Sequence, residues 1–576
     1  MNATGFGWVR RPAWALAALV TSIAVLVTGC AAIPTSSPVR QGEAVGGDRE
    51  AGAFIRVLAR PPAPGADQTQ IVEGFLAASA AFESNHEVAR QYLAPEIREA
   101  WDTSVGTVVY DPTSLDLAES PDAAAVALTA GEVAQISGRG EYAASGAGAQ
   151  VRADYDLRQV DGEWRISRLP SGLLLSTLDV ARAFRSFSLM FVDASGVRLV
   201  PDSVVVPAAL PGVSTTLVRA LLAGPTPWLA PAVTTAFPPG TSLTAAAAPI
   251  ADGIATVQLS ADVLSAGPEA RRQLSAQLVW TLRQLPEVTG VRIRAGDSAL
   301  AVPGADEVQS RDAWPSFDPD GLPADATAYA VVDGALVSGV GDSAEPVPGP
   351  LGNGSLTPSS VAVSLDGSAA ATLSGQDLLV GKWESFTAEP VLSGTDLTRP
   401  TWDPFDTVWV VDRTGAGPAV WRVQLGASPE RVEADELQGR RVLDFRMARD
   451  GARAAVILEE AGRGLLFVAR IEREADGIRI GALRRLESEL VDVRQVSWAN
   501  ATSLAVLARS ERGTLEPFVI DPNFAVTAPG SLPEVRSLAA APARPLLAVT
   551  ATSQVWVDRG FGWRAEGSAT EVAYPG

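Results

Sequence analysis

The chain has 576 residues, of which 47% are hydrophobic and 19% are charged, and its formal net charge at pH 7 is −20. This composition supports several folded domains rather than a disordered chain. The acidic balance argues against nucleic acid as a partner and against electrostatic adhesion to an anionic membrane surface.

Cysteine and histidine each occur once, as Cys30 and His86. A single cysteine cannot form a disulfide within the chain. One cysteine and one histidine also cannot supply a His/Cys zinc site or a Cys–His nucleophile pair, and a Ser–His–Asp triad would depend on His86 alone. We therefore expect no metal, no cofactor and no enzymatic activity.

The N-terminus has the pattern of a secretory signal. Two arginines precede an apolar run at 13–27, which is shorter than the roughly 20 residues needed to cross a bilayer. Small residues then precede Cys30, an arrangement that resembles a lipobox. We expect cleavage between Gly29 and Cys30, which makes 1–29 a signal peptide, and acylation of Cys30 with S-diacylglycerol and N-palmitoyl groups. The lipid would hold the protein at the extracytoplasmic face of the cell membrane. An ordinary signal peptide or an N-terminal membrane helix is the alternative.

Residues 30–66 are rich in Pro, Gly and Ser and are expected to form a flexible tether. Apolar residues at helical spacing then predict a helix at 68–83. Strand-like runs follow, so 67–180 is expected to be an α+β domain. Its order of elements is similar to the cone-shaped fold of nuclear-transport-factor-like (NTF2-like) domains. His86 lies in a link between helices. We interpret it as a solvated residue that caps the next helix, with a lone acid–base residue as the alternative.

Residues 184–300 are predicted to combine strands with two helices. The segment 217–226, LVRALLAGPT, resembles the helix motif of GerMN domains, which are known from sporulation and germination proteins. The resemblance implies an α/β GerMN domain over 184–300. Since GerMN domains are not known as enzymes, it also implies a role in assembly or ligand contact. The polar, Pro- and Asp-rich residues 301–322 are expected to be a linker.

Residues 323–576 contain almost no helical pattern. Short apolar strands alternate with turns that recur at a loose period of about 40–50 residues, which is typical of propeller blades. Five or six blades fit this length, and a β-sandwich is the main alternative. The segments 408–412 and 555–558 are interpreted as outer strands of blades. The recurring turns are Asp333-Gly334, Asp366-Gly367, Asp403-Pro404, Asp450-Gly451, Asn500-Ala501 and Arg544-Pro545.

No short motif indicates catalysis. A Gly-x-Ser-x-Gly elbow, a phosphate loop and a dinucleotide fingerprint are all missing from the sequence. Paired carboxylates can hydrolyse glycosides, and Asp444 and Asp492 lie near predicted strands, but we interpret them as solvated or turn acids. The segment 364–367, SLDG, is interpreted as a hairpin turn.

The lipobox, the α+β domain, the GerMN motif and the propeller-like half together resemble the actinobacterial lipoprotein LpqB family along nearly the whole chain. This resemblance implies an association with the MtrA–MtrB two-component system. The implied role is that of a non-enzymatic accessory that binds the extracellular domain of an MtrB-like sensor kinase and modulates signalling tied to cell-wall homeostasis and division. The alternatives are a sensor of cell-wall glycan or peptidoglycan, a weak carboxylate-based hydrolase, and a structural lipoprotein that bridges envelope components.

Overall fold

The computed structural model describes residues 59–576 apart from gaps at 83–84, 121–123, 147, 209–211, 414–416, 476, 487–489, 511, 523–524 and 533. The expected signal peptide, Cys30 and most of the tether therefore lie outside the described residues. Within the described part of the chain, no helix is long and apolar enough to cross a membrane.

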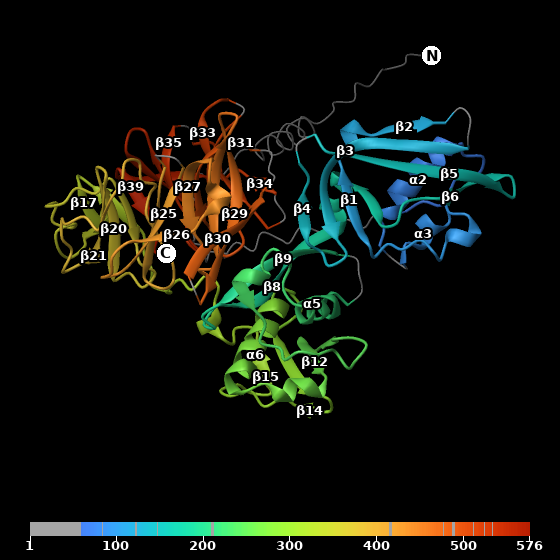
Figure 1. The fold of residues 1–576 in the computed structure, drawn as a ribbon, viewed down its shortest axis with the longest axis horizontal. Helices are drawn as coiled ribbons and strands as arrows, with labels where there is room; N and C mark the ends of the chain where they lie inside the picture. Colours follow the sequence, from blue (N-terminus) through green and yellow to red (C-terminus); the bar gives the residue numbers. More distant parts are fainter. Residues whose placement is uncertain are drawn as a thin grey trace, which may run out of the picture. The chain divides into compact units, whose positions relative to one another are not determined.

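An α+β arrangement of helices and one sheet comes first (Figure 1). Helix α2, Gln68–Ser79, begins where the sequence predicts because Asp67 and Gln70 form a capping box, but it ends earlier than predicted. Its buried Ile71 and Phe75 belong to the same core as the sheet. The sheet has the order β6-β5-β3-β1-β7, with β2 and β4 paired to β3. The other bounds are α3 Glu87–Arg90, β1 Gly106–Tyr110, β2 Asp116–Glu119, β3 Ala125–Ser137, β4 Tyr142–Ala144, β5 Gln150–Val160, β6 Glu163–Arg168, β7 Leu173–Ser176 and α4 Thr177–Ala183.

Two further sheets and two helices follow. Helix α5, Val213–Leu222, carries the GerMN-like motif and buries Leu217 and Leu221. Helix α6, Pro268–Leu282, starts at a proline, which is suited to the first helical turn, and its buried leucines join the same core. The sheet orders are β10-β8-β9 and β11-β12-β13-β14, with β15 also paired to β13. The strands are β8 Phe184–Asp193, β9 Leu199–Pro207, β10 Val233–Thr234, β11 Ile250–Ala251, β12 Ile254–Leu259, β13 Gly290–Ala295, β14 Ser298–Ala299 and β15 Val308–Ser310.

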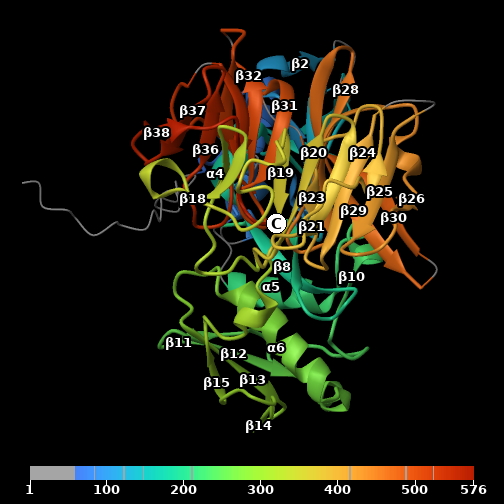
Figure 2. The ribbon, with the colours of Figure 1, turned by 90° about the vertical axis from the view of Figure 1, so that its left-hand side faces the viewer.

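Six four-stranded antiparallel sheets account for the strands described from residue 329 onward, and they form a β-propeller rather than a sandwich (Figure 2). This confirms the propeller prediction and selects the larger of the two expected blade numbers. The strands are β16 Tyr329–Val332, β17 Ala335–Ser338, β18 Glu345–Pro346, β19 Ser360–Val363, β20 Ala369–Ser374, β21 Asp377–Lys382, β22 Leu392–Ser393, β23 Thr401–Trp402, β24 Thr407–Asp412, β25 Ala419–Gln424, β26 Glu430–Val432, β27 Arg441–Met447, β28 Arg453–Glu460, β29 Arg463–Glu474, β30 Gly477–Arg485, β31 Val491–Trp498, β32 Leu504–Arg509, β33 Leu515–Ile520, β34 Val526–Thr527, β35 Val535–Ala539, β36 Leu547–Thr550, β37 Gln554–Asp558, β38 Trp563–Ser568 and β39 Glu571–Ala573.

The first and last strands of the propeller share one blade. The sheet order β18-β17-β16-β39 places the last strand beside the first, with Ala330 opposite Val572 and Val331 opposite Glu571. Strands β19, β23, β27, β31, β35 and β39 contribute residues to the axial channel and are the innermost strands of their blades. The ring is therefore closed by pairing between its two ends.

Two strands predicted to be outermost lie inside their blades. Strand β24 is second in its sheet and β37 is third, so the prediction for 408–412 and 555–558 was wrong. The physical reason is burial on both faces: β24 is buried at every position except Asp412, which lies at its end. Trp409 in this strand is fully buried. A run that is apolar on both faces is typical of a covered strand, not of a blade edge.

The recurring turns join strands as predicted. Asp333 and Gly334 both have positive φ, 49° and 81°, as a two-residue hairpin between β16 and β17 requires. In the 364–367 segment, Asp366 accepts a hydrogen bond from the hydroxyl of Ser364 at 2.6 Å, which fixes the turn between β19 and β20. Lys382, the only lysine of the chain, is exposed at the end of β21, opposite Ala369 in register.

Candidate functional site

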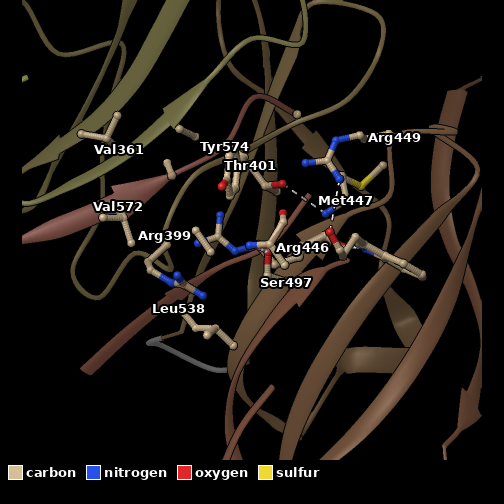
Figure 3. A pocket seen from close by; sticks show the side chains of 16 residues that line it. Val361, Arg399, Thr401, Arg446, Met447, Arg449, Ser497, Leu538, Val572 and Tyr574 are labelled. Carbon is tan, nitrogen blue, oxygen red and sulfur yellow. Dashed lines mark hydrogen bonds between the residues drawn. The ribbon is translucent and has the colours of Figure 1, made fainter. Parts of the chain in front are cut away.

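The axial channel of the propeller contains two cavities. One, the C-end cavity, lies where the innermost strands end and has a volume of about 40 Å³ (Figure 3). The other, the N-end cavity, lies where these strands begin and has a volume of about 260 Å³. Arg399 lines both cavities, so it stands at the boundary between them. The polar side chains of the N-end cavity are Thr398, Arg399, Arg413, Asp444, Arg494, Gln495, Arg536, Ser537 and Glu571.

A group of four charged side chains, which we call the charged layer, occupies this boundary: Arg399, Asp444, Arg446 and Glu571. Nη2 of Arg399 donates a hydrogen bond to Oδ2 of Asp444 at 2.6 Å, and the backbone amide of Val496 donates to the same oxygen at 3.0 Å. Nε of Arg446 lies 4.0 Å from the other carboxylate oxygen. Asp444 is 3% exposed, so its charge is held by two guanidinium groups and not by water.

The pKa values of the two carboxyl groups in the charged layer, Asp444 and Glu571, are shifted in opposite directions. Burial favours the neutral form of Asp444, but Arg399 and Arg446 outweigh it and lower the pKa of Asp444 below its usual value. Burial raises the pKa of Glu571, although Arg399 and a hydrogen bond from Ser537 Oγ at 2.8 Å oppose the shift. Asp444 is therefore fixed as an anion, whereas Glu571 is held in a site that disfavours its charge.

The C-end cavity is bordered by a buried arginine. Arg449 donates from Nε and Nη2 to the carbonyl oxygen of Pro575 at 3.0 and 2.8 Å, and from Nη1 to that of Trp498 at 3.3 Å. Burial lowers the pKa of Arg449 to about 10, so it remains a cation at neutral pH. Figure 3 shows Arg449 beside Met447 at this end of the channel. Because its guanidinium donates hydrogen bonds to the segment that follows β39, Arg449 stabilises the position of the end of this strand.

The carboxylates considered from the sequence are not solvated. Asp444 and Asp492 are 3% and 6% exposed, so the interpretation as solvated or turn acids was wrong. Asp492 accepts a hydrogen bond from the amide of Gly464 at 3.0 Å and pairs with Arg494 and Arg509 at 2.7 and 3.0 Å. Because each acid has its own arginine partners, both serve to hold strands together.

The carboxyl that shares the N-end cavity with Asp444 is Glu571, which sequence reasoning missed. Asp492 does not line that cavity. Glu571 is separated from Asp444 by most of three blades, and only the closure of the ring brings it to the channel. The one feature of the sequence that could have indicated a role for Glu571 is its charge at the start of an apolar strand.

His86 is buried, which corrects the prediction of a solvated cap. It occupies the residue before helix α3, but its side chain makes no capping hydrogen bond. The imidazole is 5% exposed and lies 4.8 Å from the ring of Phe82 and 5.7 Å from that of Trp101, measured between ring centres. Burial lowers the pKa of His86 to about 4. The histidine is thus a neutral core residue near pH 7, packed between aromatic rings.

Among the described residues, no group of three or more His, Cys, Asp and Glu side chains is placed to hold an ion.

Comparison with known families gives three matches along the chain. The model described as the N-terminal domain of lipoprotein LpqB matches residues 61–181. The model Germane, described as sporulation and spore germination, matches 188–301. The model described as the lipoprotein LpqB beta-propeller domain matches 334–575.

Relatives named lipoprotein LpqB match this chain over nearly its full length. Lipoprotein LpqB of Thermobifida fusca is 32% identical, with 98% of this chain and 99% of the relative covered. Lipoprotein LpqB of Streptomyces coelicolor is 31% identical, with 99% of each chain covered. Among solved structures, the tandem GerMN domains of GerM from Bacillus subtilis align at a TM-score of 0.20 and 16% identity, over 27% of this chain and 59% of that one.

The charged layer predicts opposite outcomes for two matched substitutions. Asp444→Asn leaves Arg399 and Arg446 without a buried counter-charge and should lower the free energy of unfolding by roughly 3–5 kcal/mol at pH 7. Glu571→Gln keeps an acceptor for Ser537 and removes a charge that burial disfavours, so it should change stability by less than about 1 kcal/mol or increase it. Urea unfolding of both variants measures the difference, and equal losses would contradict the assigned pKa directions.

The single histidine allows a direct measurement of its pKa. Because the folded pKa of His86 is lower than that of the unfolded chain, the stability it contributes is complete above about pH 6.5 and is lost as the pH falls towards about 4. Proton NMR of the His86 ring should show no titration between pH 8 and about 5.5. A midpoint near the ordinary histidine value of about 6.5 would contradict the buried position.

Proposed function

The chain belongs to the LpqB lipoprotein family, and on this premise we propose that it is a lipid-anchored, non-enzymatic accessory protein of the cell envelope. Its partner in this proposal is the extracellular domain of a two-component sensor kinase of the MtrB type. Binding would modulate signalling tied to cell-wall homeostasis and division. The observation that carries the proposal is the match to LpqB lipoproteins over 98–99% of the chain at 31–32% identity.

The mode of attachment is part of the proposal. Cleavage between Gly29 and Cys30 would leave a diacylated and N-acylated cysteine as the anchor, with residues 30–66 as the tether outside the cytoplasm. Two or more acyl chains give the stable anchoring that one chain does not. The family name, lipoprotein, supports the anchor. The chain then needs no attraction to anionic lipid, which its net charge of −20 would oppose.

We further propose that the α+β part is an NTF2-like domain. The support is a helix that packs, through large aromatic side chains, on a sheet whose pairs are antiparallel except for β1 with β7 and contain register shifts. Phe75 of α2 lies 5.0 Å from Trp101 and 6.2 Å from Tyr155 of β5, measured between ring centres. Such a helix-lined sheet, like the GerMN part and the propeller, offers surfaces for binding another protein.

A regulatory effect on a kinase has a thermodynamic requirement. The accessory must bind two states of the kinase with different affinity, because a ligand that binds both equally shifts no population. We place the docking surface on the propeller or the GerMN part. The rigid closed ring of the propeller suits this role, since little conformational entropy is lost when a rigid surface binds.

One observation favours the alternative of a glycan-binding sensor or weak hydrolase. Asp444 and Glu571 line the same cavity and have pKa values displaced in opposite directions, which is the arrangement of acid–base pairs. Against it stands the engagement of Asp444 by Arg399 at 2.6 Å, which removes this carboxylate from the role of a free base.

The proposal predicts direct binding to the kinase. Residues 31–576 titrated by calorimetry with the purified extracellular domain of the cognate sensor kinase should give saturable binding with a dissociation constant in the micromolar range or tighter. Residues 323–576 titrated in parallel identify the part that docks. The absence of heat and of competition at high concentration would contradict the kinase proposal, and a glycan-binding screen would then test the alternative.

The anchor predicts a separate outcome. Cys30→Ala removes the acylation site, so the protein should leave the membrane fraction or retain its uncleaved signal peptide. Cell fractionation and mass spectrometry of the N-terminus measure both effects. Substitution of Thr28 by Ser, which keeps a small residue before the cysteine, serves as the control. Normal processing and membrane retention of the Cys30→Ala variant would overturn the lipidation proposal.

A further inference from the structure

The N-end cavity has a surplus of cationic side chains. Four arginines line it, Arg399, Arg413, Arg494 and Arg536, against two acids, Asp444 and Glu571. The arginines lie next to or within β23, β24, β31 and β35. Three different blades therefore contribute arginine side chains to the lining of the N-end cavity. This surplus stands in a protein whose net charge is −20.

The ion pairs of these arginines leave part of the positive charge unmatched. Arg413 pairs with Asp396, an acid outside the cavity lining. Arg494 pairs with Asp492 at 2.7 Å, but Asp492 is shared with Arg509 at 3.0 Å. Two arginines thus divide one acid, and each retains donors beyond those it uses.

Arg536 is the least compensated member of the set, and Arg399 shares its acidic partner with another arginine. Asp444, the partner of Arg399, also lies 4.0 Å from Arg446. The single negative charge of Asp444 is therefore shared by two arginines. Arg536 forms no ion pair with the residues that the structure describes, and its side chain borders the cavity from an exposed position on the innermost strand β35. A guanidinium carries five donors in a fixed fork, and that fork matches the two oxygens of a carboxylate or phosphate.

We propose that the N-end cavity is a binding site for a small organic anion, whose carboxylate or phosphate oxygens accept hydrogen bonds from the guanidinium groups of Arg399 and Arg536. Arg413 and Arg494 add positive potential at the rim. The site goes beyond the proposed kinase binding and does not depend on it, since the ligand is a small molecule held inside the propeller.

The size and lining of the cavity define the ligand further. Its volume of about 260 Å³ is just below the range of roughly 300–1,000 Å³ that holds drug-sized ligands, so the bound group is small. Leu373, Leu397 and Leu507 are buried and add apolar surface to the lining. A charged cleft with low-dielectric walls focuses its field, which raises the local concentration of anions. The ligand class is thus an anion with a short apolar or neutral body.

The test uses two anions that represent the two oxyanion chemistries. The full chain, purified in a non-ionic detergent, is titrated by calorimetry with citrate and, separately, with inorganic pyrophosphate at constant ionic strength. We expect saturable binding of at least one of them at one site per chain, with an affinity that falls as salt is added. Binding of citrate alone assigns a carboxylate ligand, and binding of pyrophosphate alone assigns a phosphate ligand.

Matched variants locate the site. Arg536→Gln should weaken binding at least tenfold, and since Arg536 is exposed and has no described ion pair, the variant should unfold at the wild-type urea concentration. Arg431→Gln removes another exposed arginine, from the outer strand β26, and should leave binding unchanged. If neither anion binds saturably at millimolar concentration, or if Arg536→Gln and Arg431→Gln bind equally well, the proposal is overturned. Kinase binding by the same variants is a separate measurement.

Discussion

The pairing of β39 with β16 is the constraint on which the propeller depends. Only three residue pairs join these strands, yet they connect the beginning of the ring to its end. Without them, β16 would present an unpaired edge, and five complete blades and one three-stranded blade would form an open arc with no enclosed axis. The pairing also places Glu571 at the channel. Just beyond β39, Arg449 donates a hydrogen bond to the carbonyl oxygen of Pro575. The chemistry of the channel therefore exists only in the closed ring.

Contacts between consecutive blades explain why the channel tolerates buried charges. Removing Asp444 and Arg446 from water is costly, and their attraction repays that cost only with good geometry. The innermost strands supply that geometry: the Val496 amide of the next blade approaches the carboxylate that Arg399 already holds. Buried ion pairs often add little net stability compared with apolar packing, but this one depends on three consecutive blades that bring Arg399, Asp444 and Val496 within 2.6 and 3.0 Å. The charged layer thus favours a unique alignment of neighbouring blades.

The architecture could be predicted from the sequence because its signals are local. Asp333-Gly334 adopts the positive φ values that a hairpin needs, and such turns recur whenever a blade begins. The site could not be predicted, because its members meet across long separations: Arg399 reaches Asp444 over 45 residues, and Asp444 reaches Val496 over 52. The prediction that His86 is solvated was wrong for a similar reason. A polar residue in a polar link looks solvated until the distant aromatic ring of Trp101 is placed against it. Burial of single polar residues is a tertiary property, whereas turn chemistry is not.

The scarcity of lysine has a practical side. Lys382 is the only primary amine among the side chains, and amine-directed acylating reagents do not modify guanidinium groups under mild conditions. A dye, a biotin or a cross-linker coupled through such a reagent will therefore mark one side chain of the propeller. In the register of β20 and β21, Lys382 stands opposite Ala369, whereas Leu373 of the N-end cavity lies towards the other end of the same strand pair. The molecule carries a built-in point for surface immobilisation or single-fluorophore work that leaves the arginine-lined cavity open.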